Sequence, residues 1–164
     1  MVMRFGVLTT SDRSSRGERM DETSPAIIKE IEEAGWQIIR SAIVPDDFFI
    51  IKETLKTWVL IGDMDVILTT GGTGCSPRDI TPEATLEVVQ RLVPGLSEAM
   101  RSQSMLINKH AMLSRGIAGI SETVFIINLP GSPRAAVENF TVIKSVLGHA
   151  VELLHNDPDS EKHH

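Results

Sequence analysis

Apolar and polar residues come in alternating blocks along the chain, and the blocks predict strands that alternate with helices. Four apolar runs, at residues 4–10, 36–44, 65–70 and 123–129, have the length of strands. The third run, DVILTT, is apolar on both faces, which is typical of a central strand in a parallel sheet. Strands separated by helices in this way specify an α/β fold with a mainly parallel sheet and right-handed crossovers.

The stretches between these runs have apolar residues at three- and four-residue steps, which is the spacing of an amphipathic helix. Most of them start near a Thr, Ser or Asp that can cap a helix, and prolines stand at several first helical positions. The predicted helices run from Thr23 or Ser24 to Gly35, from Asp46 or Asp47 to about residue 60, from Thr81 to about Arg91, over 97–113, and from Pro133 to Leu154.

The length of 164 residues is that of one domain, which we expect over residues 1–155. The tail at 156–164, NDPDSEKHH, is expected to be frayed, and its terminal histidine pair is given no metal role. Methionines in the region 97–113 are interpreted as filler of the core. A subunit contact is the alternative for that region.

Composition narrows the classes of function. The net charge is −6 and only 4% of residues are aromatic, which argues against a general nucleic-acid binder. The single cysteine, Cys75, excludes an internal disulfide framework and fits a reducing cytoplasm. No apolar run approaches the about 20 residues of a membrane span, and the first residues turn polar too soon for a secretory signal. We therefore expect a soluble cytoplasmic protein without a membrane or nucleic-acid partner.

Polar and glycine-rich segments follow the ends of the predicted strands. In open α/β sheets, ligands bind at the carboxyl ends of the strands, so these segments are expected to converge on one rim. The segments are TTSDR at 9–13, PDD at 45–47, TTGGTGCSPRD at 69–79 and NLPGSP at 128–133.

The GGTG segment at 71–74 is a candidate phosphate cradle, because glycines let backbone N–H groups approach an anion closely. It is not a Walker loop, and Pro77 stands where a dinucleotide fingerprint has its third glycine. Arg78 is a candidate to meet a phosphate, with a solvated ion pair as the alternative. Asp79 is a candidate to hold Mg²⁺ or an N–H-rich ring, and Asp46 is either a second such acid or a plain helix cap. No histidine lies near Cys75 in sequence, so a nucleophilic thiol is not expected.

Four segments, GGTGCSPRDITPEAT, TTSDRSSRG, LSRGIAGI and INLPGSP, together resemble the MogA/MoaB-type molybdopterin adenylyltransferases of molybdenum cofactor biosynthesis. The resemblance is collinear from about residue 4 to residue 154. It implies a three-layer αβα sandwich, a homotrimer or larger assembly, and transfer of AMP from ATP to the terminal phosphate of molybdopterin. It also implies a need for Mg²⁺, release of pyrophosphate and a downstream molybdate-insertion enzyme.

The resemblance also implies site residues. Asp46 and Asp79 match the two carboxylates that the family needs for activity, and at least one of them is expected to hold Mg²⁺. The residues expected to bind substrate are Ser11, Asp12, Gly71, Gly72, Thr73, Gly74, Arg78, Ser114, Arg115, Asn128, Pro130, Gly131 and Ser132. A non-catalytic MoaB-like pterin-binding or carrier protein and a nucleotide-binding regulatory domain remain as alternatives.

Overall fold

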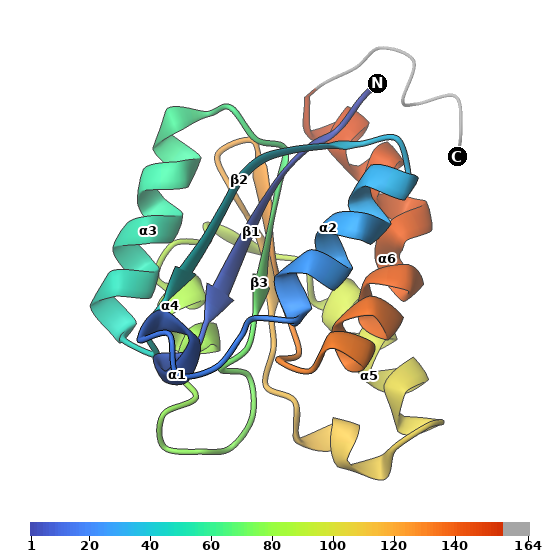
Figure 1. The fold of residues 1–164 in the computed structure, drawn as a ribbon. Coiled ribbons are helices and arrows are strands. Elements are labelled where there is room, and N and C mark those ends of the chain that lie inside the picture. Colours follow the sequence, from blue (N-terminus) through green and yellow to red (C-terminus); the bar gives the residue numbers. More distant parts are fainter. Residues whose placement is uncertain (156–164) are drawn as a thin grey trace.

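A computed structural model describes residues 1–155 and shows one six-stranded sheet with helices on both faces (Figure 1). The strand order is β2-β1-β3-β6-β5-β4. The first four strands in this order are parallel, and the last two pairings, β6 with β5 and β5 with β4, are antiparallel. The predicted α/β sandwich with a mainly parallel sheet is therefore confirmed. The strands are β1 (Arg4–Thr10), β2 (Gln37–Val44), β3 (Val66–Thr70), β4 (Arg91–Leu92), β5 (Ala118–Ser121) and β6 (Val124–Leu129).

The helices form the two outer layers. Helices α2, α5 and α6 cover one face of the sheet, and α3 and α4 cover the other (Figure 1). The helices are α1 (Asp12–Ser15), α2 (Thr23–Glu33), α3 (Phe48–Ile61), α4 (Thr81–Leu86), α5 (Pro94–Met105) and α6 (Pro133–Leu154), with a 3-10 turn η1 (Lys109–Leu113). None of the helices in residues 1–155 is long and apolar enough to span a membrane.

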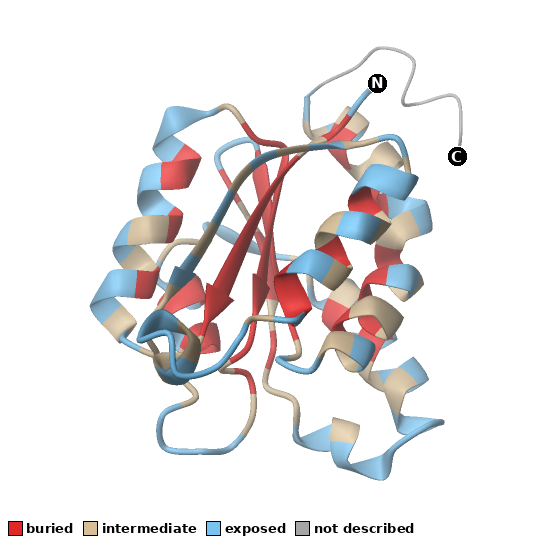
Figure 2. Ribbon diagram, in the orientation of Figure 1, coloured by how far each residue is buried: buried red, intermediate tan, exposed pale blue. Residues whose placement is uncertain are grey.

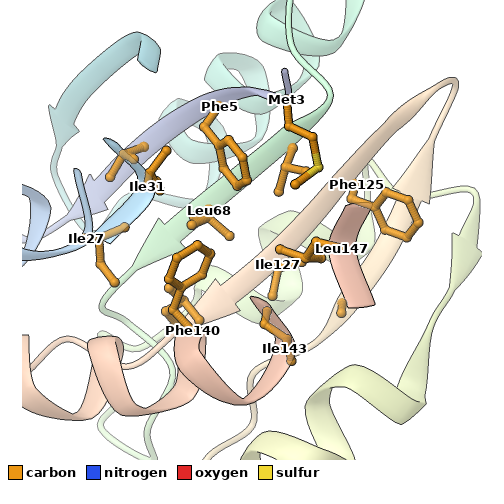
Figure 3. Close-up of a cluster of buried hydrophobic side chains, with 14 of the residues drawn as sticks. Met3, Phe5, Ile27, Ile31, Leu68, Phe125, Ile127, Phe140, Ile143 and Leu147 are labelled. Carbon is orange, nitrogen blue, oxygen red and sulfur yellow. The ribbon is translucent and has the colours of Figure 1, made fainter. Parts of the chain in front are cut away.

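The core consists of one cluster of apolar side chains on each face of the sheet. Every residue of β3 and β6 is buried, as the apolar runs predict, and Figure 2 shows the central strands enclosed between the helical layers. In the larger cluster, Phe5 stacks on Trp36 at 5.3 Å between ring centroids. Phe5 also meets Phe140 edge-on at 6.2 Å, and Figure 3 shows both phenylalanines among the buried side chains. Phe140 of α6 and Ile27 and Ile31 of α2 belong to this cluster, which packs both helices against the sheet.

The predicted helix from Thr81 to about Arg91 is wrong in its second half. Helix α4 ends at Leu86, and Arg91 and Leu92 pair antiparallel with Ile120 and Gly119 of a strand that was not predicted. Gly119 permits this close approach, because a Cβ atom there would lie 2.8 Å from Val89 Cγ1. The sheet pairing therefore overrides the helical pattern.

The predicted helix over 97–113 is also divided differently. Helix α5 begins earlier, at Pro94, and ends at Met105, and a 3-10 turn follows. Only Met100 of the three methionines is buried, with 3% exposed, whereas Met105 and Met112 are 39% and 59% exposed. The interpretation as core filler thus holds for Met100 alone.

The helix caps also differ in part from the prediction. The Asp21 carboxylate, and not Thr23 or Ser24, accepts the backbone N–H groups at the start of α2, at 2.9 and 3.1 Å. Asp47 caps α3 through a bond from the N–H of Ile50, which frees Asp46 for another role. The tail 156–164, which was expected to be frayed, lies outside the described residues.

Candidate functional site

Two adjacent cavities open at the rim where β1, β3 and β6 end. The first, which we call the acidic cavity, has a volume of about 290 Å³ and is lined by Asp46 and Asp79 together with Ser11, Gly71, Gly72 and Gly131. The second, the arginine cavity, has a volume of about 600 Å³ and is lined by Arg101 and Arg134 together with Thr73, Gly74, Ser114 and Pro130. Ser132 lines both cavities. The GGTG segment thus contributes its first half to one cavity and its second half to the other.

The first two glycines of this segment form a turn that no other residue fits. Gly71 and Gly72 have φ values of +94° and +63°. A Cβ atom on Gly71 would lie 2.5 Å from the carbonyl oxygen of Thr10, and one on Gly72 would lie 2.3 Å from Thr81 Oγ1. The backbone bonds on both sides, since the N–H of Gly71 donates to Leu129 O at 3.2 Å and Gly72 O accepts from the N–H of Thr81 at 3.1 Å. The turn is therefore fixed between the ends of β1 and β6 and the start of α4.

Asp12 and Asp46 connect the turns that follow β1 and β2. The N–H of Asp12 donates to Asp46 Oδ2 at 2.9 Å, and the N–H of Asp46 donates to Asp12 Oδ1 at 3.1 Å. Arg78 donates from Nε and Nη2 to the same Asp12 carboxylate, each at 3.0 Å. The Arg78 side chain is 64% exposed, so the ion pair faces solvent and a phosphate would compete with Asp12 for it.

The pKa of Asp46 is raised above the ordinary value of an aspartate. Partial burial is the main cause, and the negative charges of Asp12 and Asp79 add to it, while the N–H of Asp12 and the charge of Arg78 act in the opposite direction. A cation bound between these carboxylates would offset their repulsion, because it attracts each of the negative charges.

Asp79 is held in place by hydrogen bonds to the backbone of its own loop. Its Oδ2 accepts the N–H of Ser76 at 3.0 Å, and its N–H donates to Ser76 O at 2.9 Å. A Cβ atom on Gly74 would lie 2.9 Å from Asp79 Oδ2, so the absence of a side chain at Gly74 makes room for the carboxylate.

Arg115 was expected to bind substrate, but its guanidinium is occupied by protein groups. Nε donates to Gly74 O at 2.7 Å, Nη2 donates to Asp79 O, and Nη1 pairs with Glu83. The N–H of Arg115 also donates to Thr73 O at 2.8 Å. Arg115 therefore holds both ends of the segment 74–79 in place.

Asn128 was likewise expected to bind substrate and lies instead beneath the site. It is only 2% exposed. Its side-chain N–H groups donate to Thr69 Oγ1 at 2.8 Å and Thr85 Oγ1 at 2.9 Å, and its oxygen accepts the N–H of Ile117 at 3.2 Å. These side-chain hydrogen bonds all go to protein groups, so Asn128 joins β3, β6 and α4 under the glycine turn.

The remaining expected residues lie at or beside the two cavities. Ser11 caps the short helix α1 through a bond from the N–H of Ser14. Ser114 lies on the wall of the arginine cavity, where its carbonyl oxygen accepts from Arg101 at 3.0 Å. The turn that includes Pro130, Gly131 and Ser132 runs between the cavities, and Gly131 O accepts from the Thr23 hydroxyl at 2.7 Å.

Asp21, a further carboxylate of the acidic cavity, was not predicted from the sequence. Its Oδ2 accepts from the Ser24 hydroxyl at 2.5 Å and from the Thr9 hydroxyl at 2.8 Å, in addition to the two backbone donors at the start of α2. Burial opposes ionisation of Asp21, but these hydrogen bonds outweigh burial and hold its pKa below the ordinary value. The signal that could have revealed it is an Asp immediately before a helix start.

The protein can supply only some of the ligands that a divalent cation in the acidic cavity would need. In residues 1–155, no group of three or more His, Cys, Asp or Glu side chains is arranged to hold a metal ion. Mg²⁺ typically uses one or two protein carboxylates and takes its other ligands from water and substrate phosphates. Asp46 and Asp79 on the wall of one cavity fit that requirement.

Comparison with known proteins gives concordant matches. The profile of the family described as "Probable molybdopterin binding domain" matches residues 6–149. The chain is 43% identical to the molybdenum cofactor synthesis protein cinnamon of Drosophila melanogaster over 93% of its length, although it spans only 26% of that protein. It is 36% identical to molybdopterin adenylyltransferase of Escherichia coli K12, covering 92% of this chain and 78% of the enzyme. The crystal structure of the molybdopterin biosynthesis enzyme MoaB of Thermus thermophilus superposes with a TM-score of 0.90, at 43% identity and with 95% and 98% of the two chains covered.

Proposed function

The chain belongs to the molybdopterin-binding domain family, and we propose that it acts as a molybdopterin adenylyltransferase in molybdenum cofactor biosynthesis. It transfers AMP from ATP to the terminal phosphate of molybdopterin and releases pyrophosphate. Its relatives named molybdopterin adenylyltransferase cover more than nine tenths of this chain at 36% and 37% identity. Asp46, Asp79 and the glycine turn are the groups that we propose for this reaction.

The observation that carries the proposal is the position of the GGTG segment between two cavities. A transfer between two substrates needs two adjacent binding sites that bring the reacting groups of the substrates together. Residues 71–74 line one cavity with their first half and the other cavity with their second half, so they lie where the two sites are adjacent. Two arginines and one carboxylate, that of Glu138, line the larger cavity, whereas four carboxylates and one arginine line the smaller one, so the two sites differ in charge. Two substrates of different structure are thus supported better than one.

The protein's part in the reaction is orientation and charge stabilisation. The terminal phosphate of molybdopterin is already an anionic nucleophile, so no general base is required. The glycine turn brings backbone close to the transferring phosphoryl group, and Arg115 keeps the segment 74–79 in one position. Asp46 and Asp79 are the residues that would hold Mg²⁺. The cation would offset the repulsion between these two carboxylates and the phosphate oxygens nearby. When bound, Mg²⁺ supplies positive charge that offsets the charge developing on those oxygens.

The remaining features of the proposal concern the assembly and its surroundings. We propose one functional domain over residues 1–155, a homotrimer or larger assembly, a cytoplasmic location and a downstream enzyme that inserts molybdate. Exposed apolar side chains at the end of α5 and in η1 support a subunit contact there. These side chains belong to Met105, Leu106, Ile107, Met112 and Leu113.

A non-catalytic carrier is not favoured, because curated relatives over most of the chain are named as adenylyltransferases. The test is to incubate the purified protein with ATP, Mg²⁺ and molybdopterin and to quantify adenylylated molybdopterin and pyrophosphate. An enzyme forms both in equal amounts. A carrier would bind molybdopterin and form neither, which would overturn the proposal.

A further inference from the structure

We propose that Arg19 binds a phosphate group of the substrate in the acidic cavity and that Asp21 positions it there. The proposal rests on the proposed function for the identity of the substrates. Both residues lie in the loop between α1 and α2.

The first observation is the charge of the cavity wall. Arg19 is the basic residue among those lining the cavity, and it stands with the carboxylates of Asp21, Glu22, Asp46 and Asp79. A wall with this balance repels a phosphate unless positive charge is supplied locally. Mg²⁺ at Asp46 and Asp79 would supply it on one side, and Arg19 supplies it on the side of the α1–α2 loop.

The second observation is that the Arg19 side chain has no ion pair within residues 1–155. Its neighbour Arg16 is paired with Glu18 through Nε at 2.7 Å. Asp21, two residues away, directs its carboxylate to Thr9, Ser24 and the backbone N–H groups at the start of α2. A guanidinium without a carboxylate partner retains its donors for a ligand, and its planar fork matches two phosphate oxygens.

The third observation is that the backbone is fixed on both sides of Arg19. Before it, Gly17 has a φ of +71°, its N–H donates to Ser14 O at 3.1 Å, and the N–H of Glu18 donates to Arg13 O at 2.9 Å. These two bonds form a Schellman motif that closes α1. After it, Asp21 is held by four hydrogen bonds. Only Arg19 and Met20 lie between these anchors, and both line the cavity.

Asp21 is a positioning residue in this account. Its carboxylate ties the loop to Thr9, the penultimate residue of β1, and the Thr9 hydroxyl also contacts Thr70 Oγ1 at 3.1 Å, at the end of β3. The loop that carries Arg19 is therefore anchored at the ends of β1 and β3, where the glycine turn also lies. Because the backbone around Arg19 is already fixed, only its side chain has to be ordered when it binds phosphate, which reduces the entropic cost of binding.

The experiment compares the wild type with Arg19→Met and Arg19→Lys, and with Arg13→Met as a control of equal charge change. Arg13 is exposed on α1 and does not line the cavity. Steady-state adenylylation is measured with each substrate varied in turn, so that the KM for ATP and the KM for molybdopterin are obtained separately. Arg19→Met is expected to raise one of the two KM values about tenfold or more, with a smaller change in kcat. Arg19→Lys is expected to restore part of the loss, and Arg13→Met to match the wild type.

The substrate whose KM rises is the one whose phosphate Arg19 contacts. Two unchanged KM values in an active Arg19→Met enzyme would overturn the proposal. Binding of ATP and of molybdopterin is also measured by calorimetry, without turnover. A wild type that forms no product would refute the proposed function, and the Arg19 proposal would then stand or fall on whether Arg19→Met weakens either binding constant.

The role of Asp21 is tested by a double-mutant cycle. Asp21→Asn keeps an oxygen for the backbone N–H groups but loses the charge that accepts two hydroxyl donors. It is expected to raise the same KM as Arg19→Met, and the double variant is expected to add little, because both changes remove one interaction. Effects that add in full would show that Asp21 acts independently of Arg19.

Discussion

The backbone N–H of Asp12 donates to the carboxylate of Asp46 at 2.9 Å, and the backbone N–H of Asp46 donates to the carboxylate of Asp12 at 3.1 Å. This reciprocal pair joins the turns after two adjacent parallel strands, β1 and β2. It sets Asp46 in the wall of the acidic cavity while leaving Asp47 to cap α3. The two carboxylates repel each other, and the backbone donors hold them together in spite of it.

The first prediction concerns the pH dependence of Asp46. Its pKa in the folded protein is raised above the ordinary value of 3.8 by burial and by the charges of Asp12 and Asp79. As the solution is acidified, Asp46 is therefore protonated at a higher pH than an ordinary aspartate. Activity that needs its ionised carboxylate is lost at that higher pH. A pH–rate profile measures this acid limb, and higher Mg²⁺ is expected to move it to lower pH. A limb that does not respond to Mg²⁺ would argue against a metal role for this carboxylate.

The same shift has a consequence for stability. A carboxyl group with a raised folded-state pKa contributes stability below its unfolded pKa, and this contribution is lost as the pH rises through the folded pKa. Asp46→Asn is therefore expected to be at least as stable as the wild type at pH 7 while losing activity. Thermal denaturation at pH 7 measures this. A clear fall in Tm would mean that Asp46 serves the fold.

The second prediction concerns Arg115 as the residue that holds the segment 74–79. Arg115→Met removes the bonds to Gly74 O and Asp79 O, and we expect adenylylation to fall by a factor on the order of 10². Arg115→Lys is expected to recover little, because an ammonium cannot reach both carbonyl oxygens and Glu83 as the guanidinium fork does. Glu83→Gln is the matched control, since it keeps an oxygen acceptor for Nη1. An Arg115→Lys enzyme with wild-type activity would contradict this role.

The third prediction concerns the glycine turn. Gly72→Ala places a Cβ atom 2.3 Å from Thr81 Oγ1 at a φ of +63°, so the turn must shift and activity is expected to fall sharply. Gly95→Ala is the control, because a Cβ atom there meets nothing within 4 Å and the residue lies in α5. Alanine stabilises a helix relative to glycine by about 0.5–1 kcal/mol, so Gly95→Ala is expected to keep its activity and gain slightly in Tm. Equal activities of the two variants would show that the turn tolerates a side chain.

The main strands and layers of the fold could be predicted because buried parallel strands are continuous apolar runs. The run at 65–70 and the run at 123–129 correspond to β3 and β6, and both are buried throughout. The short antiparallel pair of β4 and β5 could not be predicted in this way. β4 has two residues and β5 has four, one of them Gly119, so the pair depends on contacts made after the sheet has formed.

The site could be predicted as a set of residues but not as a set of contacts. Motifs at the strand ends placed Asp46 and Asp79 on one rim, and both do line one cavity. The occupied guanidinium of Arg115 and the burial of Asn128 depend on partners far away in the chain, which no local pattern encodes. Asp21 was missed because its role combines a helix cap with hydroxyl contacts to Thr9.

Whether the protein is an adenylyltransferase that depends on the charge of Asp79 is decided by measuring AMP transfer to molybdopterin by the wild type and by Asp79→Asn at saturating Mg²⁺. Asn keeps an oxygen for the N–H of Ser76 and removes only the charge, and Asp47→Asn serves as the control because Asn caps helices as well as Asp. We expect the wild type and Asp47→Asn to form adenylylated molybdopterin and pyrophosphate. Asp79→Asn is expected to bind molybdopterin but to transfer AMP more slowly by a factor on the order of 10² or more. Wild-type rates of AMP transfer by Asp79→Asn would contradict it.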